Sequence, residues 1–210
     1  PQRVFTGGIR EIVQRRLNTV PEDAQYLLKL AAIIGRQIDI ELLRTMQGSW
    51  RTPDSPEIMD VDSWLTICVI VAVLDAEDGK WRFAHDKLRE GALNLLEKEE
   101  QTHLYRQVAE ATEALYSNSK DHIASLAEYW LKAGEPEKAL KYTLNAADNA
   151  RRINAFRETI HYTQQAIELL RIHHPTTDWQ HQAADLKIRL GEAYGYLGEF
   201  EEAKQHLRES

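Results

Sequence analysis

His85 and Asp86 are the residues of this sequence whose types and spacing best fit a chemical role. They lie within WRFAHDKLREGAL, residues 81–93, where a short apolar segment runs directly into an amphipathic one. This pattern predicts a strand that ends near Ala84 and a helix that begins at the His-Asp pair. Asp is a preferred N-cap residue, so we expect Asp86 to cap this helix. His85 would then lie at the bend, where its ring can contact a ligand or pack against a neighbour.

No other set of residues predicts a catalytic or metal site. The sequence has no GxxxxGK phosphate loop followed by Ser or Thr, and no GxSxG nucleophile motif. Its single cysteine, Cys68, is flanked by apolar residues, which raise the pKa of a thiol and oppose nucleophilic use. Cys and His residues do not occur together at zinc-ligand spacing. We therefore expect no catalysis, no metal and no cofactor bound by this segment alone.

The composition is that of a folded, acidic protein. With 210 residues, 43% of them hydrophobic, the chain can build one large core or two small ones. A formal net charge of -7 opposes nonspecific attraction to nucleic acid. The longest apolar stretch, residues 65–74, is far shorter than the roughly 20 residues of a membrane span, and no secretion signal precedes it. We expect a cytoplasmic protein without a membrane partner and, since it opens at Pro1, an excised fragment.

Breaker residues divide the first part of the chain into helices and one hairpin. We expect helices over residues 9–18, 21–34, 39–46 and 60–71, the first released by Gly7-Gly8 and the second ended by Gly35. Residues 48–56, GSWRTPDSP, form a loop. A strand and the turn at Asp78-Gly79 then predict a hairpin. A long helical region follows from residue 86 to about 116, with a break near Glu99. The inner face of the second helix consists of Ala24, Leu27, Leu28, Leu30, Ala31 and Ile34.

Two stretches after residue 120 share the alternation of small and large residues that is typical of tetratricopeptide repeats. The first contains Leu126, Ala127, Trp130, Gly134 and Ala139, and the second contains Leu190, Gly191, Tyr194, Gly198, Phe200, Ala203 and Leu207. Ala127 and Gly191 lie 64 residues apart, short of the roughly 68 residues of two repeats, so we expect a degenerate middle copy over about 150–170. A repeat cannot bury its own inner face, so the final helix should leave apolar residues exposed among Tyr194, Tyr196, Leu197 and Leu207.

These features resemble the winged-helix region of STAND-class signalling ATPases, bacterial multidomain proteins in which helical repeats follow an ATPase core. The resemblance rests on the His-Asp pair after the hairpin and on two stretches, IREIVQRRLNTVPEDAQYLLKLAAIIGRQIDIELLRTM (9–46) and DVDSWLTICVIVAVL (60–74). It covers most of residues 1–170. It implies an upstream core that holds ADP or ATP, and a contact between His85 and the β-phosphate of ADP that keeps the protein closed.

We therefore predict an all-α chain with one small β-hairpin. A winged-helix domain over 1–100 and a connecting helix over 101–119 precede tetratricopeptide-like antiparallel helical repeats over 120–210. The predicted function is non-catalytic: the chain couples partner binding to the nucleotide-dependent state of the upstream core. The expected partners are that core, a protein or peptide on the repeats, and a second copy through the exposed terminal repeat. The residues expected to bind a protein are Glu128, Leu131, Lys132, Asp185, Ile188, Glu192 and Tyr196.

Two other functions remain open from the sequence. One is a scaffold that binds a protein without any link to a nucleotide. The other is a winged-helix transcription regulator, whose third helix, over about 36–50, would enter the DNA major groove. In that helix Arg36 and Arg44 stand against Asp39 and Glu41, which leaves no net charge, so we expect no nucleic-acid partner.

Overall fold

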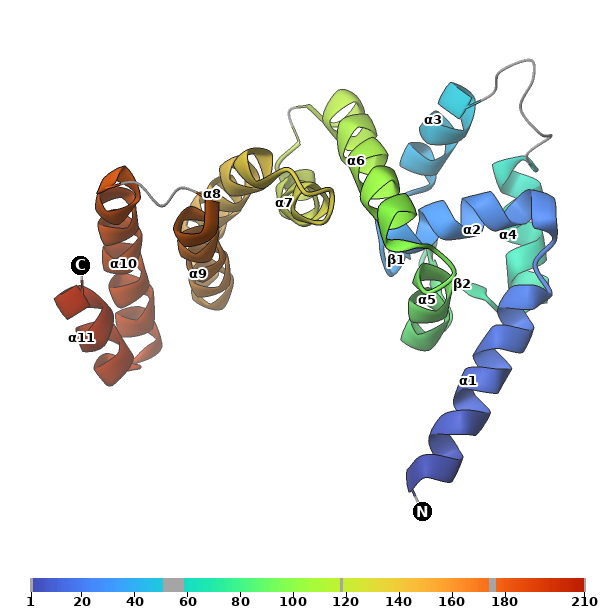
Figure 1. Cartoon of the computed structure of the whole chain (residues 1–210), viewed down its shortest axis with the longest axis horizontal. Helices are drawn as coiled ribbons and strands as arrows, with labels where there is room; N and C mark the ends of the chain where they lie inside the picture. Colours follow the sequence, from blue (N-terminus) through green and yellow to red (C-terminus); the bar gives the residue numbers. More distant parts are fainter. Residues whose placement is uncertain (1, 51–58, 118, 174–176, 210) are drawn as a thin grey trace. The chain divides into compact units, whose positions relative to one another are not determined.

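The structure is a computed structural model. It describes the backbone of residues 2–50, 59–117, 119–173 and 177–209, and the side chains of residues 8, 10–48, 59–117, 119–173 and 183–208. The chain divides into two compact parts, unit 1 (Pro1–Leu115) and unit 2 (Tyr116–Ser210) (Figure 1). The described residues are mostly helical, with one small antiparallel sheet, which confirms the coarse fold class predicted from the sequence.

Unit 1 contains six described helices. They are α1 (Gln2–Asn18), α2 (Glu22–Ile34), α3 (Ile40–Trp50), α4 (Val61–Ile70), α5 (Asp86–Leu93) and α6 (Lys98–Leu115). Two predicted boundaries are wrong. α1 runs through Gly7-Gly8 instead of starting after it, because glycine lowers helix stability without forbidding helical backbone. α3 continues to Trp50, so the loop predicted over 48–56 begins later, and its part from residue 51 on lies outside the described residues.

The break predicted near Glu99 separates α5 from α6 at residues 94–97. Gln101, in the first turn of α6, reaches back across it. Its amide Nε2 donates to the carbonyl oxygen of Leu93 at 3.0 Å and to that of Leu96 at 3.2 Å. These bonds connect the first turn of α6 to the last residue of α5 and to the segment between the two helices. Most of α6 lies in the segment 101–119, which the sequence analysis predicted to be a connecting helix. In the structure α6 packs against α2 and α3 and so belongs to unit 1.

The sheet of unit 1 has three strands, where the sequence predicted only a hairpin. The predicted hairpin is present as β2 (Leu74–Glu77) and β3 (Lys80–Phe83), and both turn residues have positive φ angles, 51° at Asp78 and 73° at Gly79. The additional strand, β1 (Gln37–Ile38), pairs with β3, so the order is β1-β3-β2. Two residues are too short a segment to show the alternation by which strands are recognised in a sequence.

The core of unit 1 is built around α2, which packs against α3, α4, α5, α6 and β1. Its predicted inner face is confirmed: all six of the predicted residues are buried. Trp64 from α4 and Phe83 from β3 are fully buried against this core. Cys68 is also fully buried, and burial raises the pKa of its thiol to about 12.

Unit 2 is a series of antiparallel helices in which each packs against the next (Figure 1). A short 3-10 helix, η1 (Lys120–His122), leads into the five helices that the described residues of this unit form. They are α7 (Ile123–Lys132), α8 (Pro136–Arg152), α9 (Phe156–His173), α10 (Thr177–Leu197) and α11 (Phe200–Glu209). Part of the core consists of Ala166, Leu170 and Leu186, against which three partly buried residues pack, namely Leu140, Leu144 and Ile167.

Three of the turns in unit 2 have the same backbone geometry. Each has one residue in the left-handed region, with φ angles of 71° at Gly134, 57° at Asn154 and 78° at Gly198. After each of these residues, the next backbone N–H donates to a carbonyl five residues earlier, at 3.0, 2.9 and 3.0 Å. This bond is the mark of a Schellman turn, which ends one helix and redirects the chain into the next.

The repeated turn changes the interpretation of the middle copy. Asn154 joins α8 to α9, so α8 takes part in two successive hairpins, one with α7 and one with α9. The expected degenerate repeat over 150–170 is therefore a second hairpin that shares a helix with the first. The 64 residues from Gly134 to Gly198 contain three described helices, α8, α9 and α10, whereas two full two-helix repeats would contain four.

Small residues let the paired helices approach each other. A Cβ on Gly191 of α10 would lie 2.6 Å from Leu207 Cγ and 3.2 Å from the backbone oxygen of Ala203, both on α11. Gly191 lies seven residues before its turn, and Ala127 and Ala147 occupy the same place before the other two turns, where both are buried. The small residues recognised in the sequence thus mark the places where helices cross closely.

Candidate functional site

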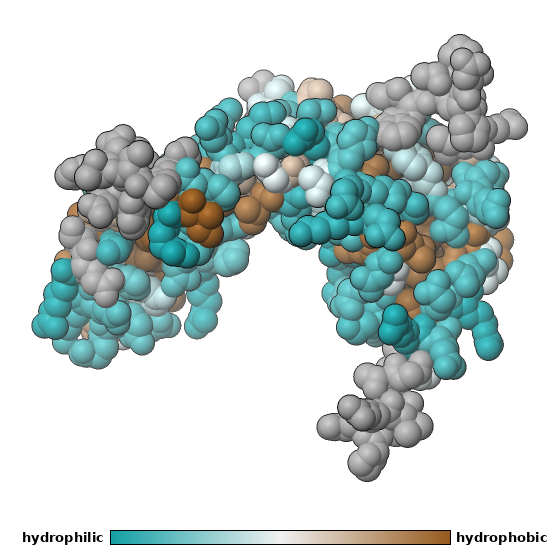
Figure 2. Space-filling view, viewed as in Figure 1, coloured by the Kyte–Doolittle hydropathy of each residue, from teal (hydrophilic) through white to brown (hydrophobic). Residues whose placement is uncertain are grey.

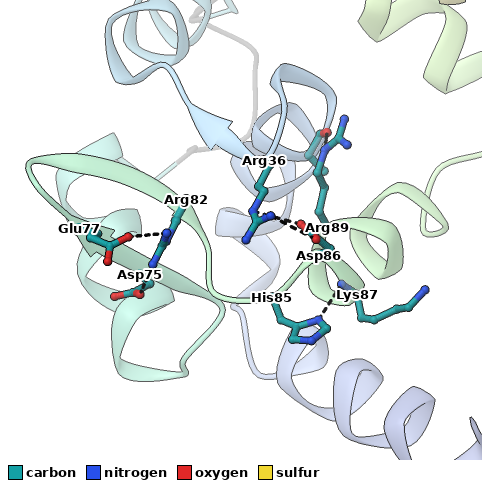
Figure 3. A network of polar contacts seen from close by, with 9 residues as sticks. Arg36, Asp75, Glu77, Arg82, His85, Asp86, Lys87 and Arg89 are labelled. Atoms are coloured by element: carbon teal, nitrogen blue, oxygen red, sulfur yellow. Dashed lines mark hydrogen bonds and ion pairs between the residues drawn. The ribbon is translucent and has the colours of Figure 1, made fainter.

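His85 lies at the junction of β3 and α5, as the sequence predicted (Figure 3). Its backbone is extended, with φ -150° and ψ 143°, and its ring nitrogen Nδ1 accepts a hydrogen bond from the backbone N–H of Lys87 at 3.1 Å. His85 itself is therefore the N-cap of α5. The prediction that Asp86 caps this helix is wrong, because the helix begins one residue earlier than a cap at Asp86 requires.

Asp86 instead forms a two-point ion pair with Arg36, which lies just before β1. The Asp86 oxygens Oδ1 and Oδ2 lie 3.2 Å from Arg36 Nε and 3.4 Å from Nη1 (Figure 3). Both side chains are more than half exposed, so the pair adds little to stability. The pair places a carboxylate and a guanidinium at the same junction as His85, whose ring points away from them (Figure 3).

The cap determines which ring nitrogen of His85 carries a proton. A nitrogen that accepts a hydrogen bond has no hydrogen of its own, so Nδ1 is unprotonated and Nε2 carries the N–H of the neutral ring. His85 is exposed, and Nε2 has no hydrogen-bond partner among the described residues. The junction thus presents one neutral N–H donor to the solvent, which suits an anionic oxygen of a ligand.

The basic residues around His85 are engaged with neighbouring groups. Arg89 Nε donates to the carbonyl oxygen of Ala32 in the last turn of α2 at 2.8 Å. Arg82 pairs with Asp75 at 3.5 Å and with Glu77 at 2.5 Å across the hairpin (Figure 3). The junction therefore holds its cations in internal pairs and does not form an open basic surface.

Neither a metal-ion cluster nor a membrane-spanning helix occurs among the described residues. No group of three or more His, Cys, Asp or Glu side chains there is placed to hold a metal ion. No described helix combines the length and the apolar character that crossing a membrane requires. Hydrophilic residues cover most of the face in view in Figure 2, and hydrophobic residues gather there in patches.

The three residues predicted on α7 to bind a protein lie close together. Glu128 and Lys132 are joined by an ion pair of 2.6 Å, and Leu131 between them is 38% exposed. An ion pair between residues four apart on an exposed helix face contributes only a few tenths of a kcal/mol, about 0.3–0.5. All three residues are accessible to a partner, and the charges of Glu128 and Lys132 are paired with each other.

The four residues predicted on α10 have different surroundings. Asp185 and Ile188 are exposed on its surface. Glu192 pairs with Arg151 of α8 at 3.2 Å, and Tyr196 stacks on Phe156 of α9 with ring centroids 4.7 Å apart. The structure thus links α10 to α8 and α9 through these side chains, and the α7 and α10 residues do not form one set of contacts.

Sequence reasoning missed the role of α8, whose polar face carries charges that reach α10. Asp148 pairs with Arg189 at 2.7 Å, and Arg151 pairs with Glu192 at 3.2 Å. On each helix the two charged residues are three positions apart, and the order of the charges is reversed between the helices. That reversal was visible in the sequence, but the partner helix could not be chosen without the structure.

The last hairpin leaves apolar residues on the surface, as predicted. Tyr196 is 73% exposed and Leu207 is 49% exposed, and Tyr194 and Leu197 are partly exposed. Phe200, at the start of α11, is 64% exposed as well. Comparison of the chain with models of known families, with curated proteins and with solved structures finds no match.

Proposed function

We propose that this chain is a non-catalytic regulatory and protein-interaction region of a cytoplasmic STAND-type signalling ATPase. In this proposal unit 1 is a winged-helix domain that docks on an upstream ATPase core, and unit 2 carries tetratricopeptide-like repeats that bind a protein. Helices α1 to α4, followed by the hairpin β2–β3 and the His-Asp junction, support the first part. The three helix hairpins with one turn geometry support the second part.

The observation that carries the proposal is the hydrogen bonding of the His85 ring. Its Nδ1 is occupied by the helix cap, so its exposed Nε2–H is free to donate to a phosphate oxygen. ADP bound in the core would supply that oxygen. The contact would hold unit 1 against the core, and its loss would free unit 1 to swing away.

The coupling requires that a partner of unit 2 binds one state better than the other. A partner that binds more tightly when unit 1 is released shifts the equilibrium toward the open state, and ADP release becomes easier in proportion. A partner with equal affinity for both states has no effect. This requirement distinguishes a switch from a scaffold, which is the second candidate function.

Retention of ADP by the longer protein that includes the core tests the role of His85. His85→Ala removes both the cap and the ring, whereas His85→Asn keeps a capping oxygen and removes only the ring. Both variants lose the proposed contact between the His85 ring and the phosphate, so both should release labelled ADP faster. The expected change is about tenfold or more, as for loss of a charge-assisted hydrogen bond.

Retention that falls in His85→Ala but stays normal in His85→Asn would show that His85 acts only as a helix cap. Normal retention in both variants would favour the scaffold. Labelling of the buried Cys68 thiol serves as a control for folding, because this thiol reacts only when unit 1 opens.

The transcription-regulator alternative is disfavoured by the ion pairs of unit 1. Arg36 pairs with Asp86, and Arg44 on α3 pairs with Asp62 at 2.6 Å. On the hairpin, Arg82 is held by two carboxylates. DNA phosphates would compete with these carboxylates for the arginines, and the carboxylates would repel the phosphates. A mobility shift at low salt that disappears with added salt would restore this alternative.

A further inference from the structure

An open groove lies on unit 2 along the polar face of α8. Its volume is about 630 Å³, within the range of ligand-binding sites. Lys120 of η1 and Ile123 of α7 form one side of it. The rest is lined by four residues from the second half of α8, namely Asn145, Asp148, Arg151 and Arg152. All six residues are outside the set that the sequence predicted.

The charges in the groove are of two kinds. Asp148 and Arg151 are already matched, because their ion pairs with Arg189 and Glu192 direct them toward α10. Lys120 and Arg152 are exposed and form no ion pair within the described part of the chain. The groove therefore has two unmatched cations, one at η1 and one at the end of α8, and no unmatched carboxylate among its lining residues.

The other two lining residues extend the chemistry of the groove. Asn145 is exposed, and its amide can donate to and accept from a peptide backbone. Ile123 is half-buried and offers an apolar surface beside Lys120. A segment with carboxylates for the two cations, a backbone for the amide and an apolar side chain for Ile123 would match all four groups.

We propose that this groove binds an acidic peptide segment that carries apolar residues between its carboxylates. The proposal rests on the protein-binding role proposed for unit 2 and names the chemical class of the partner. Charge complementarity selects the occupant, since the groove's own paired charges cancel and its free charges are both positive. The peptide lies along α8, so binding engages the helix that two hairpins share.

Fluorescence anisotropy with the full 210-residue chain tests this proposal. The probe is a labelled decapeptide of alternating Glu and Leu, compared with the same peptide in which Gln replaces Glu. The Glu peptide should bind saturably, and its affinity should fall as salt is added. Inorganic phosphate is the competitor that tests for a simple anion site, and it should not displace the peptide at equal concentration.

Two double variants with the same change in net charge locate the site. Lys120→Glu with Arg152→Glu reverses the free cations of the groove, and should weaken binding by about tenfold or more through loss of two charge-assisted contacts. Lys141→Glu with Arg157→Glu reverses two exposed cations outside the groove, and should change the affinity less than about twofold.

Equal weakening in both variants, equal binding of the Gln peptide, or displacement by inorganic phosphate would overturn the proposal. If the charge-reversed variant fails to fold by circular dichroism, Lys120→Gln with Arg152→Gln takes its place, and unchanged affinity there would overturn it too. ADP retention in the His85 variants tests unit 1 alone, so failure of the groove and failure of the proposed nucleotide switch are distinguishable.

Discussion

The two units of this chain are stabilised in different ways. In unit 1, segments far apart in the sequence come together: β1 pairs with β3, α1 packs against α5, and Lys29 of α2 reaches Glu100 of α6 at 3.0 Å. In unit 2, each helix packs against the next, and the turns at Gly134, Asn154 and Gly198 have the same geometry. A core with long-range contacts unfolds as one body, whereas a series of neighbouring hairpins can open locally.

This difference separates the proposed roles. A cooperative unit is suited to hold His85 in one position relative to a phosphate, because the cap, the hairpin and α2 are all part of one core. A series of hairpins is suited to bind along its length, because each added hairpin extends a continuous surface. The comparison can be tested by substitutions that affect the two units unequally.

The largest expected effect is the loss of a buried leucine from unit 1. Leu28 on α2 is fully buried, and Leu28→Ala should lower the free energy of unfolding by about 2–5 kcal/mol. Because unit 1 is cooperative, Cys68 on α4 should then react with a thiol reagent about thirtyfold faster or more at pH 8. Buried and protonated, Cys68 does not react while unit 1 stays closed.

The matched substitution in unit 2 is Leu170→Ala on α9, whose side chain is also almost fully buried. Hydrogen exchange should become faster in α8, α9 and α10, the neighbours in the series, and less so in α11. The labelling of Cys68 should stay unchanged. Uniform loss of protection throughout unit 2 would contradict the view that its hairpins open locally.

The raised thiol pKa also gives unit 1 a dependence on pH. The pKa of Cys68 is raised from 9.0 to about 12 by burial, so the folded state holds this proton more tightly than the unfolded state. Its contribution to stability is fully present below pH 9 and is lost as the pH rises toward 12. Labelling at pH 8 therefore measures opening of unit 1 without this loss.

Much of the fold followed from local patterns in the sequence. The inner face of α2, the start of α4 near Asp60, the hairpin turn and the small residues of the helix hairpins were all predictable, because each depends on residues close together in the chain. β1 and the sharing of α8 between two hairpins were not predictable. β1 depends on pairing with β3, which lies far away in the sequence. The sharing of α8 depends on a turn that uses Asn154 in place of glycine.

The candidate sites show the same division. The position of His85 at a strand-to-helix bend followed from the sequence, but its role as the cap depended on a one-residue boundary that no pattern fixes. The groove along α8 was missed because its cations are ordinary surface residues until the pairing of Asp148 and Arg151 with α10 is known.

A smaller effect is expected from glycines on α10. Gly191→Ala should destabilise unit 2 by about 1–3 kcal/mol, because the new Cβ meets Leu207 and the backbone of Ala203. Gly195→Ala on the same helix meets nothing within 4 Å, and should instead stabilise the helix by up to about 1 kcal/mol through helix propensity. Chemical denaturation of both variants measures the difference.

A second substitution tests whether the hairpins are equivalent. Leu207 lies nine residues after its turn, where the other two hairpins have Thr143 and Thr163. Gly191→Ala combined with Leu207→Thr reproduces the Ala-Thr pair of those hairpins and should recover about 1 kcal/mol or more of the loss. No recovery would mean that the three hairpins share a turn but not a helix crossing.

The smallest effect concerns the buried threonines. Thr143 and Thr163 are fully buried, and their hydroxyls have no hydrogen-bond partner among the described residues. An unpaired buried hydroxyl is unfavourable, so Thr143→Val and Thr163→Val should each stabilise unit 2 by about 1 kcal/mol in chemical denaturation. Thr112 of unit 1 provides the control: its hydroxyl donates to the carbonyl oxygen of Val108 at 2.7 Å.

Thr112→Val should therefore change the stability of unit 1 by less than about 0.5 kcal/mol, since it removes the hydroxyl together with its hydrogen bond. If Thr143→Val and Thr163→Val are destabilising instead, their hydroxyls are hydrogen-bonded in solution, and the crossings of unit 2 are polar contacts. If they are stabilising, two equivalent positions of unit 2 carry the same unfavourable group. Its recurrence nine residues after the turns at Gly134 and Asn154 then follows from repetition of one hairpin design.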